Sequence, residues 1–169
     1  MAFQAAGDLG PTAVTFYLVS YFVTTMGAFG VVTVLSDGSS EPEDMDDYRG
    51  LFWRRPALAA VFTAMLLSLA GIPITAGFIG KFYVVAAGAS SAMWALIVIL
   101  VITSAIGLFY YLRIIVVMYG LPSESPASVS RLAPAGSLAL ALLAALLVWF
   151  GVFPGPLLSL IRNAIAGLA

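Results

Sequence analysis

The sequence contains neither cysteine nor histidine among its 169 residues. Their absence excludes disulfides, thiolate chemistry and metal sites built from thiolate or imidazole ligands. It also removes the side chain whose unperturbed pKa lies nearest to neutrality. Any proton transfer by this chain must therefore use Lys, Asp, Glu, Tyr or water.

Charge is scarce as well. Charged residues make up 9% of the chain and hydrophobic residues 62%, with a mean hydropathy of +1.09. Ordinary soluble domains have about 25% charged and about 45–50% apolar residues. A chain this apolar cannot cover itself with polar surface, which excludes a soluble globular enzyme. The net charge of −1 provides no basic field for nucleic acid, so we expect no nucleic-acid partner.

The few charges are concentrated in one segment. Nine of the fifteen charged residues lie between Asp37 and Arg55, and four long apolar stretches surround this segment, at about residues 11–35, 56–90, 92–119 and 134–160. A hydrocarbon core of about 30 Å requires about 20 helical residues, and only helices or closed barrels can cross it. The sequence therefore predicts an all-α fold, a polytopic transmembrane helix bundle forming a single membrane domain over residues 1–169 with four spans.

Proline marks the start of three of these spans, at Pro11, Pro56 and Pro134. The first turn of a helix tolerates proline because its missing N–H would have no helical partner there. The segment before Pro11 is too short and irregular for a secretory signal.

The second apolar stretch is too long for a single straight span. Its thirty-five residues would measure about 52 Å as one helix. Gly71, Pro73 and Gly77 lie near its middle, and each weakens or redirects a helix. We therefore predict a span broken near residues 71–77 into half-helices of about 56–70 and 77–90. Helices broken at membrane depth mark ion and substrate sites in transporters.

Lys81 follows this break and is the only charged residue deep in any predicted span. A central lysine costs about 2.5–3.5 kcal/mol on membrane-insertion scales. One interpretation is a snorkelling lysine that reaches the interface along its stem. The other is a proton-binding lysine whose pKa is lowered by desolvation. We favour the second, because the position is central and adjoins the break.

Hydroxyl side chains on the first three spans are candidates for lining a hydrated path. They could equally form interhelical hydrogen bonds, which is the more common role of such residues. Arg113, near one end of the third span, could snorkel or contact another subunit. The candidate hydroxyl residues are Tyr17, Tyr21, Thr24, Thr25, Thr63, Ser68, Thr103, Ser104, Tyr110 and Tyr111.

Basic residues predict the orientation in the membrane. Four of them lie in the loops at residues 37–55 and 120–133, against Arg162 alone on the other side. By the positive-inside rule these loops are cytoplasmic, and both termini then face outward. The four loop residues are Arg49, Arg54, Arg55 and Arg131.

The segment from Leu67 to Tyr83, LSLAGIPITAGFIGKFY, resembles the broken helix of the antiporter-like proton-pumping subunits of respiratory complex I, the NADH:quinone oxidoreductase. The chain is most similar to subunit N of that family. Lys81 is followed by Phe82 and Tyr83, as the lysine of subunit N is. Residues 110–119 resemble the penultimate helix of subunit N, and residues 17–29 resemble the helix that precedes its broken helix. The resemblance covers nearly the whole chain, and the loop at 37–55 and the last helix are its least distinctive parts.

The resemblance implies both a role and a missing portion. Family members carry two inverted repeats, and this chain resembles only the last four helices of such a subunit. Lys81 then corresponds to the terminal lysine of the proton path, in a proton-translocating membrane-arm subunit of a bacterial cytoplasmic membrane. The expected partners are the lipid bilayer, other membrane-arm subunits and a chain supplying the missing N-terminal helices, unless the sequence is a fragment of a longer subunit. NADH, flavin, iron–sulfur clusters and quinone are expected on partner subunits, with no cofactor or metal on this chain.

Other functions stay open on the sequence. A subunit of a related multi-subunit Na⁺/H⁺ antiporter or membrane-bound hydrogenase would share the broken helix and often the lysine. A structural or assembly membrane protein would tolerate replacement of Lys81. A retinal protein is disfavoured, because no deep carboxylate offers a counter-ion to a Schiff base.

Overall fold

The computed structural model describes residues 2–36, 44–122 and 134–167, and within these ranges all regular structure is helical. The predicted all-helical class is therefore confirmed. In chain order the elements are α1 (Ala2–Leu35), the 3₁₀ helix η1 (Met45–Tyr48), α2 (Leu51–Arg54), α3 (Pro56–Ala70), α4 (Ala76–Ser90), α5 (Trp94–Tyr119), α6 (Pro134–Val152) and α7 (Pro154–Ala166).

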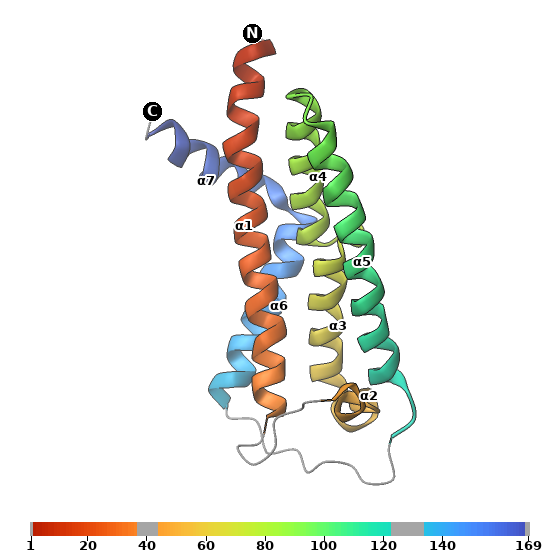
Figure 1. Ribbon diagram of the computed structural model, residues 1–169. Coiled ribbons are helices and arrows are strands. Elements are labelled where there is room, and N and C mark those ends of the chain that lie inside the picture. The colour runs from red at the N-terminus through yellow and green to blue at the C-terminus, as the bar shows by residue number, and fades with distance from the viewer. Residues whose placement is uncertain (1, 37–43, 123–133, 168–169) are drawn as a thin grey trace.

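The long helices run side by side, with α3 and α4 following one another end to end between α1 and α5 (Figure 1). α1 contacts α3, α4, α6 and α7, whereas α5 packs on α3 and α4 from the other side. The short α2 lies at one end of the bundle, and the start of α1 and α7 lie toward the other (Figure 1). α1 and the α3–α4 pair are thus central, and α5 is peripheral.

Three helices are long and apolar enough to cross a membrane, at Gly10–Leu35, Trp94–Tyr119 and Ala135–Val152. They coincide with the first, third and fourth predicted spans. α3 and α4 have 15 residues each, which is short of the roughly 20 that a crossing requires. The number of four crossings therefore stays a prediction, which depends on α3 and α4 crossing together.

The second apolar stretch is interrupted where the sequence predicts it. α3 ends at Ala70 because Gly71 adopts a left-handed conformation with φ of 83°. The Gly71 amide donates to the Ser68 carbonyl and the Ile72 amide to the Leu67 carbonyl, both at 3.0 Å. This pair of bonds is a Schellman motif, the usual way in which glycine ends a helix.

A turn and a cap then start α4. The amide of Thr75 donates to the carbonyl of Ile72 at 3.3 Å, closing a turn over Pro73. The Thr75 hydroxyl accepts the Phe78 amide at 3.3 Å, as an N-cap does. α4 consequently begins at Ala76, one residue before the predicted start.

The predicted first span agrees with the apolar segment Gly10–Leu35, but the prediction that Pro11 begins the helix is wrong, because α1 begins at Ala2 and contains Pro11 in its interior. An interior proline removes one backbone hydrogen bond, and a helix can continue past it where the residues before it favour helix. Three alanines among residues 2–6 provide that preference.

The fourth predicted span, to residue 160, is wrong at its end. α6 stops at Val152 and α7 starts at Pro154. A residue before proline is driven out of the α conformation, and Phe153 has φ of −124° and ψ of 69°. The chain therefore leaves the α6 axis about two turns earlier than predicted, and α7 runs obliquely away from the end of α6 and packs on α1 (Figure 1).

Two apolar clusters hold the helices together. The larger joins α1, α3 and α6 around Val31, Phe62, Met65 and Leu147. The smaller packs α7 on α1 and α4, with Phe16 of α1 among its buried residues. In contrast, Met118 is the only buried residue of α5. Most of the α5 surface is therefore free to face lipid or another protein.

Candidate functional site

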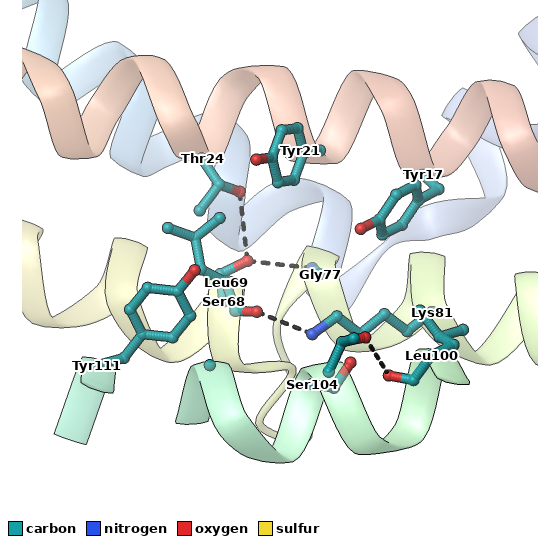
Figure 2. A pocket seen from close by; sticks show the side chains of 12 residues that line it. Tyr17, Tyr21, Thr24, Ser68, Leu69, Gly77, Lys81, Leu100, Ser104 and Tyr111 are labelled. Carbon is teal, nitrogen blue, oxygen red and sulfur yellow. Dashed lines mark hydrogen bonds between the residues drawn. The ribbon is translucent and has the colours of Figure 1, made fainter. Parts of the chain in front are cut away.

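Lys81 directs its ammonium group at the break between α3 and α4. Its Nζ donates to the carbonyl oxygen of Leu69 at 2.8 Å, as Figure 2 shows, and to that of Ala70 at 3.2 Å. Side chains on a helix lean toward its N-terminus, so a lysine in the second turn of α4 points back at α3. The snorkelling interpretation requires the opposite direction, along α4 toward Ser90.

These two bonds complete the C-terminus of α3. The last four carbonyls of a helix have no partner within it. Backbone amides of the Schellman motif bond those of Leu67 and Ser68, and Lys81 bonds the remaining two. Since the C-terminal end of a helix carries partial negative charge, it stabilises an ammonium group without any carboxylate.

No carboxylate competes for this lysine in the described spans. Residues 10–35, 56–90, 94–119 and 134–152 contain no Asp or Glu, and the carboxylate residues within the described ranges are Asp8, near the start of α1, and Asp44, Asp46 and Asp47, beside η1. The described residues also contain no group of three acidic, histidine or cysteine side chains that would suit a metal ion. Backbone dipoles, not an ion pair, therefore balance the charge of Lys81.

A cavity of about 160 Å³ lies beside the ammonium, between α1, α3, α4 and α5. It is large enough for several water molecules, and hydroxyl groups from three helices supply the partners that such waters need. Its lining, seen in Figure 2, consists of Tyr17, Tyr21, Thr24, Ser68, Leu69, Gly77, Lys81, Leu100, Thr103, Ser104, Gly107 and Tyr111.

Two of the hydroxyls connect α1 with both half-helices. The Ser68 Oγ accepts the Gly77 amide at 3.1 Å and lies 3.4 Å from the Thr24 Oγ1. The Thr24 hydroxyl gives its one proton to the Ser20 carbonyl at 2.6 Å, so Ser68 must be the donor to Thr24. The interhelical role that the sequence leaves open therefore holds for this pair.

Glycine lets the two half-helices approach each other. A Cβ on Gly77 would overlap the carbonyl oxygen of Ser68, and a Cβ on Gly71 would lie 3.1 Å from the Lys81 Cδ. Gly151 of α6 plays a similar part, since a Cβ there would overlap the carbonyl oxygen of Ile74. The break thus packs closely on protein at Gly71, Gly77 and Gly151, whereas Pro73 and Ile74 in its middle are exposed.

The structure brings together seven of the ten hydroxyl residues named from the sequence. Thr25 lines a separate groove between α1 and α6, Tyr110 is 53% exposed on the outer side of α5, and Thr63 does not line the cavity. Consecutive helical residues point about 100° apart, so an adjacent pair can present both members to the cavity, as Thr103 and Ser104 do, or only one. In the pairs Thr24–Thr25 and Tyr110–Tyr111 only one member faces it. Thr24 and Tyr111 are those members.

Sequence reasoning missed three lining residues, Leu69, Leu100 and Gly107. The α5 members of the lining are Leu100, Thr103, Ser104, Gly107 and Tyr111, which recur at intervals of three and four. That spacing marks one face of a helix and would have found Leu100 and Gly107.

Comparison with known proteins identifies the fold. A family model described as NADH:quinone oxidoreductase/Mrp antiporter, transmembrane, matches residues 1–107. NADH-quinone oxidoreductase subunit N of Nitrosospira multiformis is 50% identical over 163 residues, covering 86% of this chain and 32% of that protein. Subunit N of Ectopseudomonas mendocina is 46% identical over 172 residues, covering 97% and 34%.

A chain in the structure of respiratory complex I from Thermus thermophilus with bound aureothin matches with a TM-score of 0.77 at 32% identity, over 88% of this chain and 34% of that one. The present chain thus spans about a third of the length of the relatives it matches. The matches to subunit N and the structural likeness agree with the match to the family model. The chain belongs to the transmembrane NADH:quinone oxidoreductase/Mrp antiporter family, among its antiporter-like complex I subunits.

Proposed function

We propose that this chain acts as the C-terminal part of a proton-translocating membrane-arm subunit of NADH:quinone oxidoreductase, with Lys81 binding and releasing a proton on the transport path. The observation that carries the proposal is the position of the Lys81 Nζ, on the free carbonyls of α3 and at the wall of a hydroxyl-lined cavity. An ammonium held by dipoles alone can lose its proton without leaving a carboxylate unpaired.

The surroundings of Lys81 suit the reaction Lys–NH₃⁺ to Lys–NH₂ and back. Water in the cavity would accept or supply the proton, and the hydroxyls of Tyr17, Ser104 and Tyr111 would hold that water in place. Ser68 joins the half-helices by accepting the Gly77 amide and donates its own proton to Thr24, whose proton is bonded to the Ser20 carbonyl. Lys81 is then the proton carrier, and Ser68 and Thr24 are positioning residues.

The proposal also covers the topology of the chain in the membrane and the subunits that hold the cofactors. α3 and α4 together make the second of four crossings, with the η1–α2 end cytoplasmic and both ends of the chain outside a bacterial cytoplasmic membrane. The chain spans about a third of the length of its relatives, so the function requires the remaining helices of the subunit as well. NADH, flavin, iron–sulfur clusters and quinone belong to partner subunits.

Substitution of Lys81 in the assembled complex tests the proposal. Lys81→Met keeps the apolar stem and deletes the ionisable group, and Lys81→Arg keeps a charge that is not released near neutrality. In sealed vesicles driven by NADH oxidation with quinone, both variants should assemble and pump far fewer protons per electron. Phe82→Leu, at the neighbouring exposed position, is the matched control and should pump normally. Normal pumping per electron by either Lys81 variant would refute the assignment.

A further inference from the structure

The outer side of α5 carries an arginine among exposed apolar residues. Arg113 is exposed, and its neighbours within one helical turn are Phe109, Tyr110 and Val116, which are 64%, 53% and 71% exposed. Tyrosine and arginine on an apolar background are the residues that contribute most to binding in protein interfaces. This set of four residues, termed here the α5 outer face, is distinct from the cavity side of the helix.

Arg113 has no partner within the part of the chain that the structure describes. The ion pair there joins Arg49 and Asp46 at 2.7 Å, although η1, which contains Asp46, packs against α5. The other long basic side chain in the spans, Lys81, is satisfied by backbone carbonyls. Of the charged side chains in the described spans, Arg113 is therefore the one without an ion-pair or hydrogen-bond partner.

The position of Arg113 lies inside the apolar part of α5. It precedes Tyr119 by six residues, or about 9 Å of helical rise. Tyr119 stacks on Phe52 of α2 with ring centroids 4.7 Å apart, so the polar end of the bundle lies at that level. A charge exposed to hydrocarbon at this depth is unfavourable unless it is paired.

The direction of the side chain disfavours a lipid phosphate as that partner. Helical side chains lean toward the N-terminus of their helix, and the nearer membrane surface lies at the C-terminus of α5. The Cα–Cβ bond of Arg113 thus tilts toward the membrane interior, and the side chain must bend back to reach a phosphate group. A carboxylate at the same depth can meet the guanidinium with two parallel hydrogen bonds.

We propose that the α5 outer face docks an apolar transmembrane helix of a neighbouring chain that carries an Asp or Glu at the depth of Arg113. The two rings and Val116 supply apolar contact, and the ion pair fixes the depth and rotation of the partner helix. A second copy of this chain does not fit, because its described spans contain no carboxylate. The inference needs only that α5 spans the membrane and does not depend on proton transfer by Lys81.

Photo-cross-linking in native membranes tests the inference on the intact complex. A benzophenone amino acid replaces Val116, and mass spectrometry identifies the peptide captured. We expect an apolar segment of another chain with an Asp or Glu within one turn of the cross-link. Arg113→Gln should lower the yield at least about tenfold, since removing one member of a buried charge pair weakens binding by that much or more. Arg162→Gln, at an exposed arginine of α7, is the matched control and should leave the yield unchanged.

A charge swap is the control for the possibility that Arg113→Gln lowers the cross-link yield by misfolding. Arg113→Glu should abolish the cross-link, and changing the captured carboxylate residue to Arg in the same complex should restore it. Capture of lipid alone, capture of a second copy of this chain, a yield independent of residue 113, or failure of the swap would each overturn the inference.

Discussion

Lys81 should stabilise the end of α3 as well as carry a proton, and hydrogen exchange can measure the first role separately. Lys81→Met removes the donor of the bonds at 2.8 and 3.2 Å to the Leu69 and Ala70 carbonyls. Hydrogen bonds to a charged group each contribute about 1.5–3 kcal/mol. Cavity water can take over part of this loss, so we expect the last turn of α3 to open more easily by about 1.5–3 kcal/mol in total.

The amides of Gly71 and Ile72 report this opening, because both bond to carbonyls of that turn. Their exchange in the complex, reconstituted in lipid nanodiscs and followed by mass spectrometry of peptides covering residues 67–75, should accelerate about 10–150-fold. Lys81→Arg retains donors for both carbonyls and should exchange at nearly the original rate. Unchanged protection in Lys81→Met would refute the capping role.

The comparison of Met with Arg separates the two roles of the lysine. Proton release requires a group that deprotonates, whereas capping requires only donors and positive charge. Both variants should therefore lose pumping, and only Lys81→Met should lose protection at Gly71 and Ile72. If Lys81→Met lost both pumping and protection while Lys81→Arg kept both, the loss of pumping would be due to unfolding of the break and not to the missing proton carrier.

Three further outcomes follow from the backbone at the break and the turns. Gly77→Ala places a Cβ on the Ser68 carbonyl and should destabilise the chain by about 1–3 kcal/mol, measured as a lower amount of assembled subunit in membranes; normal levels would contradict the close approach. Ala92→Gly should stabilise the complex by about 0.5–1 kcal/mol in thermal unfolding, because Ala92 has φ of 55° in the Schellman motif that ends α4, and a lower Tm would contradict this. Single cysteines in place of Ser90 and Asp46 lie at opposite ends of the bundle, and only the one at Ser90 should react with an impermeant thiol reagent from outside; the reverse would invert the topology.

The break could be predicted from the sequence because its determinants are local. Gly71 ends α3 and Pro73 removes a donor whatever surrounds them. The end of the last span was missed although its determinant, Pro154, is equally local. A length criterion for apolar stretches overlooks a proline when the residues on both sides of it are apolar.

The composition of the cavity wall could be predicted only in part, because facing depends on the positions of neighbouring helices. Thr24 and Thr25 are chemically equivalent, and only the packing of α1 against α3 turns the first toward Ser68. The same holds for Tyr110 and Tyr111 on α5. The capping of α3 by Lys81 depends on α4 continuing beyond the break in line with α3, which no local pattern specifies (Figure 1).

α5 connects the proposed proton site with the proposed docking face, since it is the peripheral wall of the cavity. Its inner side supplies Thr103, Ser104 and Tyr111 to the lining, and its outer side carries Arg113 a half-turn away from Tyr111. α5 packs along α3 and also contacts α4, α2 and η1, although Met118 alone of its residues is buried. A partner helix bound at Arg113 would cover the outer side of α5 and so help to hold the inner hydroxyls toward Lys81. The proposed docking of a partner helix would therefore act on the cavity from the side opposite to the break.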